Sequence, residues 1–136
     1  MLHSKHLTIP ANTSEAAPYK TQFLVNQGVI YRIWVAFPGG CVGLVKLRIL
    51  HQGHPILPVE KDAYITGNNY TYEYPLMEEI ITSPETLSIE AWNEDDTYSH
   101  KIDIQILILA KKWVLPVGAY EGIIAALKSI SERRSE

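Results

Sequence analysis

Hydrophobic and polar residues alternate with a period of two over most of the first 110 positions, which is typical of half-buried β-strands. Residues 29–37, VIYRIWVAF, show the pattern most clearly and are rich in β-branched and aromatic side chains. The alternation places five of them on one face: Val29, Tyr31, Ile33, Val35 and Phe37. We therefore predict a strand over residues 29–37.

Further strands are predicted wherever the alternation resumes between turn residues, over residues 19–26, 42–50, 64–66, 70–74, 86–92 and 98–110. Short connections predict three antiparallel hairpins, which join 19–26 to 29–37, 64–66 to 70–74, and 86–92 to 98–110. Gly28 in the first connection is expected to have a positive φ. Residues 56–59 are flanked and interrupted by prolines, so they predict an edge strand or a crossing loop.

No helical period occurs in the first 110 residues, and turn residues recur about every ten positions. This spacing predicts an all-β fold, an antiparallel β-sandwich or jelly-roll-like domain over residues 1–110.

Residues 111–136 show a different pattern and are predicted to form a linker followed by an amphipathic helix. Five apolar residues recur there at spacings of three and four, and we call them the C-terminal stripe: Tyr120, Ile123, Ile124, Leu127 and Ile130. A helix of this length is marginal alone, so its apolar side must be covered. The sequence leaves open whether its own sandwich or another subunit covers it.

Composition narrows the classes of partner. Of the 136 residues, 46% are hydrophobic and 20% charged, which is typical of a folded globular protein. The chain has 12 basic and 15 acidic residues and a net charge of −3, so we expect no nucleic-acid partner. The longest apolar run is too short to span a bilayer, so we expect no membrane span.

No signal peptide is visible at the N-terminus, and we expect the mature chain to begin there.

Residues 91–98, AWNEDDTY, contain three consecutive acids that resemble a cation site at first sight. Ca²⁺ prefers several hard oxygen ligands, but the regular ligand spacing of a calcium-binding loop is missing here. Asn and Asp are also common turn residues, because their side chains bond to the nearby backbone. We therefore interpret the stretch as a solvated turn.

The histidine and cysteine residues do not predict a metal site or a catalytic site. His3 and His6, and His51 and His54, are pairs with metal-ligand spacing, yet neither pair has a distinctive third ligand. His100 is expected to be a hydrogen-bonded core or edge residue. The single Cys41 excludes an internal disulfide, and nothing near it in sequence would activate its thiol. We predict no catalytic residue, cofactor or metal ligand.

Aromatic residues are the strongest candidates for contacts with a partner. Tyr70, Tyr72 and Tyr74 share one face of a predicted strand, where they would pack within the sheet or bind a sugar or protein. Tryptophan and tyrosine are enriched in protein interfaces. The predicted interaction surface comprises this row, the C-terminal stripe, and the residues Trp34, Trp92, Tyr98 and Trp113.

Three stretches resemble the small β-sandwich structural proteins of tailed-phage virions and prophages, the decoration or head-and-tail accessory type: LTIPANTSEAAP, GVIYRIWVAFPGGCVGLVKLRIL and IEAWNEDDTYSHKIDIQIL. The resemblance implies a non-enzymatic, homo-oligomeric subunit that folds in the bacterial cytoplasm, joins other virion proteins and has no catalytic residue. A carbohydrate-binding module using the tyrosine row beside the acidic loop is the first alternative. A cupin-like metalloenzyme using His51 and His54 is the second.

Overall fold

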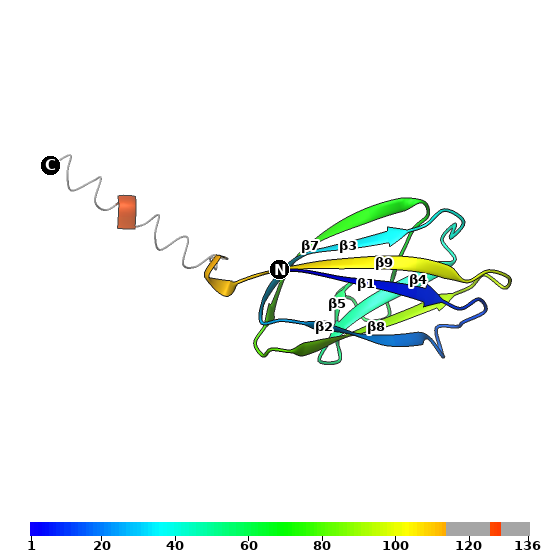
Figure 1. Cartoon of the computed structure of the whole chain (residues 1–136), viewed down its shortest axis with the longest axis horizontal. Helices are drawn as coiled ribbons and strands as arrows, with labels where there is room; N and C mark the ends of the chain where they lie inside the picture. Colours follow the sequence, from blue (N-terminus) through cyan, green and yellow to red (C-terminus); the bar gives the residue numbers. More distant parts are fainter. Residues whose placement is uncertain (114–125, 129–136) are drawn as a thin grey trace.

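The computed structural model describes residues 1–113 and 126–128, and within them two antiparallel sheets pack face to face (Figure 1). The first sheet has the order β1-β9-β3-β7. Its strands are β1 (Leu2–Ile9), β9 (His100–Leu109), β3 (Gly28–Phe37) and β7 (Tyr70–Ile80). The predicted all-β sandwich is thereby confirmed.

The second sheet has the order β2-β8-β4-β5, and the short β6 also pairs with β4. Its strands are β2 (Tyr19–Val25), β8 (Glu85–Asn93), β4 (Val45–His51), β5 (His54–Leu57) and β6 (Ile65–Thr66). After β9, residues Lys111–Trp113 form the 3-10 helix η1.

The core lies between the sheets and is built by the alternation seen in the sequence. On β9, Ile102, Ile104 and Ile106 are fully buried, and on β4 Leu47 and Ile49 are equally buried against them. Each such side chain contributes roughly 1.5–3 kcal/mol through removal from water.

Two of the predicted hairpins are wrong because consecutive strands lie in opposite sheets. β2 pairs with β8, while β3 pairs with β7 and β9. β8 pairs with β2 and β4, whereas β9 pairs with β1 and β3. Gly28 does have a positive φ, of +146°, but its connection crosses from one sheet to the other.

The third predicted hairpin is also wrong, since β6 pairs with β4 and β7 pairs with β3. A true hairpin joins β4 to β5 instead, where Gln52 and Gly53 both have positive φ. Such a turn matches the twist of antiparallel strands. β5 is an edge strand, as its prolines predict.

Two strands differ from the prediction: β1 was not predicted, and β7 is longer than predicted. β1 was not predicted at all, because His3 and Lys5 occupy inward positions where apolar residues would mark a strand. Inward charges are a known protection of sheet edges, and β1 is an edge strand. β7 continues past Pro75 to Ile80, which is compatible with its position at the opposite edge of the same sheet.

A β-bulge in β3 changes the predicted faces. The register shifts between Ile30 and Arg32 against both neighbouring strands. Ile30 is fully buried in the core, whereas Tyr31 is only half-buried and lies under the guanidinium of Arg32, 4.6 Å from the ring centre. The extra residue therefore turns Tyr31 away from the face that it was predicted to share with Ile33.

The predicted C-terminal helix lies mostly outside the described residues. Residues 126–128 are helical, and Leu127 is the member of the C-terminal stripe that is described. Tyr120, Ile123, Ile124 and Ile130 lie outside the described residues, as does the side chain of Trp113. The described part of the chain contains no helix long and apolar enough to cross a membrane.

Candidate functional site

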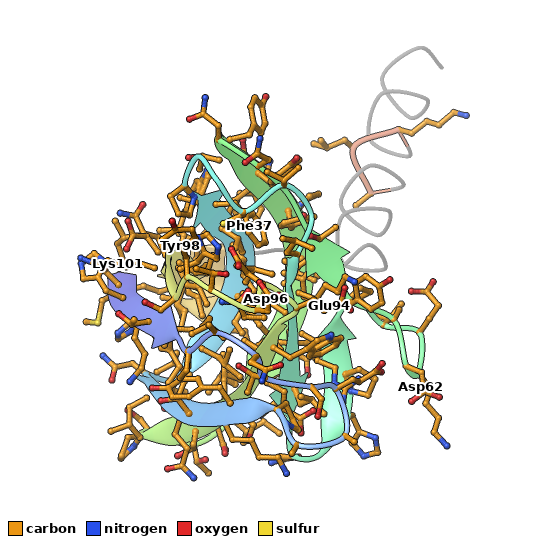
Figure 2. The ribbon with its side chains drawn as sticks, turned by 90° about the vertical axis from the view of Figure 1, so that its right-hand side faces the viewer. Phe37, Asp62, Glu94, Asp96, Tyr98 and Lys101 are labelled. Carbon is orange, nitrogen blue, oxygen red and sulfur yellow. The ribbon has the colours of Figure 1, made fainter. Side chains whose placement is uncertain are left out.

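The acidic stretch of residues 93–98 lies at the end of the sandwich where the β8–β9 connection meets two others. Figure 2 shows Glu94, Asp96 and Tyr98 at this end, which faces the viewer. The backbone N–H of Thr13 donates to the carbonyl of Asn93 (2.9 Å), and that of Glu94 donates to the carbonyl of Leu44 (2.9 Å). Backbone bonds thus join three separate connections at this end.

The fully buried amide of Asn93 joins the β8–β9 connection to the end of β1. Its Nδ2 donates to the carbonyls of Tyr98 (2.9 Å) and Ile9 (3.3 Å), and its Oδ1 accepts from the N–H of Asp95 (3.0 Å). A buried amide is stable only with such partners. The sequence interpretation assigned Asn93 to an ordinary turn and missed this role, for which composition offers no signal.

Asp95 is bonded within its own turn. Its Oδ1 accepts from the N–H of Thr97 (2.9 Å) and of Tyr98 (3.2 Å), and its Oδ2 lies 2.9 Å from Nε2 of His100. The bond from the Thr97 backbone, followed by those from His100 and Tyr98, lowers the pKa of Asp95. Its charge therefore stabilises the turn. The bonds to nearby backbone agree with the turn interpretation, but the side chain is only 12% exposed and is not solvated as that interpretation expected.

The two neighbouring acids also have partners in the chain. Glu94 forms an ion pair with Nζ of Lys46 (2.6 Å), and Asp96 accepts a hydrogen bond from Oγ1 of Thr97 (2.8 Å). Their side chains belong to two different contacts and do not converge on one point with Asp95.

Cys41 is fully buried under the same end. Burial, together with the nearby negative charge of Asp95, raises the pKa of its thiol. The thiolate is the reactive form, so both its burial and its raised pKa keep Cys41 unreactive.

The histidine pairs do not converge as metal ligands. His3 and His6 are three residues apart on β1, and strand geometry points them to opposite faces. His51 is buried with Nδ1 2.8 Å from Oε1 of Glu78, while His54 is exposed in the hairpin. Within residues 1–113 and 126–128, no three His, Cys, Asp or Glu side chains form a metal-binding group.

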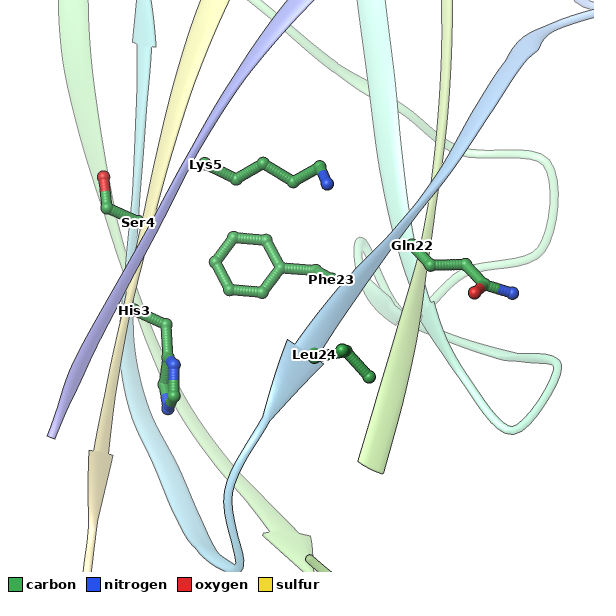
Figure 3. Close-up of a pocket in the computed structure, with 6 residues that line it drawn as sticks. All are labelled: His3, Ser4, Lys5, Gln22, Phe23 and Leu24. Carbon is green, nitrogen blue, oxygen red and sulfur yellow. The ribbon is translucent and has the colours of Figure 1, made fainter. Parts of the chain in front are cut away.

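A small surface pocket opens between the edge strands β1 and β2 (Figure 3). Phe23 and Lys5 point into the gap, and the ring of His3 meets Phe23 edge to face with centres 6.3 Å apart. Burial, followed by the positive N-terminus, lowers the pKa of His3. The pocket is an opening between two sheet edges, and its other lining residues are Ser4, Gln22 and Leu24.

The tyrosine row is largely packed within the protein. Tyr72 meets Phe37 edge to face at 6.0 Å, and Tyr74 stacks on Tyr72 at 6.3 Å. Both contact the hydrophobic core, and burial, with a further effect of Tyr72, raises the pKa of Tyr74. Tyr70, whose ring centre is 4.9 Å from that of Tyr72, is the exposed member of the row.

Trp92 requires a correction, because it is only 1% exposed and so offers no surface to a partner. Tyr64 packs edge to face against its ring at 5.5 Å, and the guanidinium of Arg48 lies 5.2 Å from the ring centre on the outer side of the sheet. Tyr98, by contrast, is 68% exposed, and Trp34 is half-buried.

The outer side of the first sheet carries an apolar patch that the sequence analysis did not predict. We call it the outer-face patch, and it comprises Leu2, Tyr31, Trp34, Met77, Leu107 and Leu109. Leu2 pairs directly with Leu107, and Leu107 with Arg32. Tyr31 and Met77 line one shallow depression. Only the bulge in β3 adds Tyr31 to the patch, which the simple alternation did not predict.

No protein-family model matches the chain, and no curated protein matches it.

Proposed function

We propose that this protein is a non-enzymatic structural and interaction subunit that forms a homo-oligomer and belongs to a phage or prophage virion as a decoration or accessory protein. The observation that carries self-association is the exposure of Leu127, which is 60% exposed although it belongs to the C-terminal stripe. An amphipathic helix in water needs a cover for its apolar side. A second subunit supplies that cover.

The nesting of strand pairs supports a jelly roll as the fold. The outermost strands β1 and β9 pair, then β2 with β8, β3 with β7, and β4 with β5 around the central hairpin. This is a single antiparallel ribbon folded across two sheets. Jelly rolls recur in viral capsid proteins, lectins and cupins, so the side chains must decide among these functions.

Among these functions, the side chains favour a non-enzymatic virion subunit over a lectin or a cupin. The acids of residues 94–96 are engaged in bonds of their own turn and in an ion pair, and Cys41 is buried. In the described part of the chain, several apolar side chains are in contrast exposed to solvent, among them Leu2, Met77 and Leu127. The resemblance to small virion proteins points in the same direction.

Light scattering of the full chain over a range of concentrations tests self-association. A mass that is a multiple of the chain mass supports the proposal, and the mass of one chain at every concentration contradicts it. Mass spectrometry of purified particles tests the virion role. Recovery of the chain with other virion proteins supports that role, and recovery only from the particle-free fraction contradicts it.

Carbohydrate binding is the second candidate, and the exposed ring of Tyr70 beside Tyr72 is the observation that favours it. Aromatic rings bind sugars by stacking, although Tyr72 and Tyr74 use their faces for packing here. A glycan array with and without Ca²⁺ tests this candidate, and Tyr70→Ala should abolish any binding.

The cupin-like alternative has less support. It requires His51, His54 and a further ligand on one metal, yet Nδ1 of His51 is engaged by Glu78. Metal analysis of the purified protein decides it, since a cupin-like enzyme holds one metal per chain.

A further inference from the structure

We infer that the C-terminal stripe of one subunit docks on the outer-face patch of a second copy, and that two copies exchange these segments reciprocally. The inference rests on the proposed self-association and adds the surface on which it takes place. The outer-face patch covers one end of the β1-β9-β3-β7 sheet, on the side that faces away from the core.

The outer-face patch is unusual for a sheet with one solvated side. Outward positions of such a sheet are normally polar. On the second sheet, the outward residues of β2, β8 and β4 are mostly polar and include Lys20, Gln22, Arg48, Ser88 and Glu90. Leu24 and Leu50 are also outward there, but they lie on β2 and β4 with Thr86 and Ser88 of β8 as their pairing partners. On the first sheet, Met77 is 61% and Leu2 is 54% exposed, beside the half-buried rings of Tyr31 and Trp34. Arg32 lies within this area, over the ring of Tyr31 and beside Leu107, so the patch surrounds one charged side chain. Exposed apolar surface of this kind marks interaction sites.

The length of the C-terminal stripe fits the outer-face patch. The helix predicted from the sequence between Tyr120 and Ile130 would extend about 15 Å, which equals about five residues of strand. The outer-face patch occupies residues 31–34 of β3 and 107–109 of β9, within that length. The C-terminal stripe is aliphatic apart from Tyr120, and the outer-face patch combines aliphatic side chains with the rings of Tyr31 and Trp34, so both are apolar.

The C-terminal segment, residues 110–136, begins beside the outer-face patch. β9 ends at Leu109, a member of the outer-face patch, and η1 follows directly. Lys111 of η1 forms an ion pair with Glu79 of β7 (2.8 Å), two residues from Met77. The chain therefore leaves the sandwich beside the patch. The C-terminal segment of each subunit begins next to the patch of its own subunit, which would receive the segment of the second copy.

A second copy, rather than the same chain, is the occupant because Leu127 of the stripe and Leu2 and Met77 of the patch are all exposed within one chain. Leu127 is 60% exposed and Met77 is 61% exposed in the same molecule. Exchange between two copies covers both at once and satisfies two-fold symmetry, in which each subunit gives and receives the same contact.

Chemical cross-linking of two singly substituted full-length chains tests the exchange. Met77→Cys and Leu127→Cys are mixed, allowed to re-equilibrate and treated with a short bismaleimide. Cys41 is fully buried and gives little background. We expect peptides linking residue 77 of one chain to residue 127 of the other, several-fold more abundant than links in the control mixture of Ser88→Cys with Leu127→Cys. Ser88 is exposed on the outer side of the second sheet.

Three other outcomes would overturn the inference, and each would indicate a different arrangement. If oligomers persist but only 127–127 links form, the helices associate with one another and the outer-face patch is not the dock. If the double variant Met77→Cys/Leu127→Cys cross-links within single chains at high dilution, the segment covers its own subunit. If light scattering shows a single-chain mass throughout, the proposed self-association fails and the exchange fails with it.

Discussion

The carboxylate of Asp95 lies 2.9 Å from Nε2 of His100 and accepts two further bonds from the backbone N–H groups of Thr97 and Tyr98. These three bonds favour the charged carboxylate, so the pKa of Asp95 is lower in the folded than in the unfolded chain. The resulting stabilisation is complete above the ordinary aspartate pKa of about 4 and is lost as pH falls through the lower folded pKa.

We expect Asp95→Asn to reduce the unfolding free energy at neutral pH, because the amide loses the charge that these bonds stabilise. The difference from the wild type should shrink as the pH falls below about 4, where the wild-type carboxyl takes up its proton. Urea unfolding at a series of pH values measures this. Asp96→Asn is the matched control, since Asp96 bonds only to the Thr97 hydroxyl. Identical pH profiles of Asp95→Asn and the wild type would refute the assignment.

Replacement of Asn93 by alanine should cost about 1–3 kcal/mol of unfolding free energy, because it leaves one buried carbonyl and two part-buried backbone groups without their partners. The partners affected belong to Ile9, Asp95 and Tyr98. Urea unfolding at neutral pH measures the loss. Tyr98→Ala, at an exposed position on the same connection, should change stability by less than about 0.5 kcal/mol. Equal effects of the two substitutions would contradict this role of Asn93.

Gly67→Ala should destabilise the protein by about 1–3 kcal/mol through overpacking. A Cβ at residue 67 would lie 2.3 Å from Cε2 of Tyr72 and 3.0 Å from Cδ2 of Phe37, so the ring of Tyr72 must move. Thermal unfolding and the near-ultraviolet circular dichroism of the tyrosines measure the effect. At Gly39, the nearest atom to such a Cβ is 3.8 Å away, and Gly39→Ala should be close to neutral. A neutral Gly67→Ala would show that the tyrosine row is not packed as described.

Cys41 should react with an aromatic disulfide reagent far more slowly in the native protein than in urea. It is fully buried, and burial together with Asp95 raises the pKa of its thiol. The absorbance of the released thiolate gives both rates. Rapid reaction of the native protein would mean that the end of the sandwich above Cys41 opens readily.

Local patterns predicted the strands well and their partners poorly. The alternation around Ile33 and Ile104 identifies strands and buried faces, because burial acts on each residue separately. Pairing depends on contacts far apart in the sequence, such as Leu2 with Leu107. None of the three predicted hairpins forms, whereas residues 51–54, where no hairpin was predicted, join β4 to β5 through a tight turn at Gln52 and Gly53.

The periodicity of single strands was also a poor guide to which aromatic side chains are exposed. Trp92 alternates like an outward residue, and its position is indeed outward, but Tyr64 and Arg48 from other segments cover it. Tyr31 alternates like an inward residue, and a single extra residue in β3 turns it outward. Coverage by distant segments and bulges both arise from tertiary packing, so neither is visible in the periodicity of one strand.

Light scattering of Leu127→Glu beside the wild type tests self-association through the C-terminal stripe most directly. Val59→Glu is the control, because Val59 is an exposed apolar residue outside the stripe. We expect a multiple of the chain mass for the wild type and for Val59→Glu, and the mass of one chain for Leu127→Glu. A wild-type protein that is a single chain, or a Leu127→Glu variant that keeps the wild-type mass, would contradict the proposed role of the stripe.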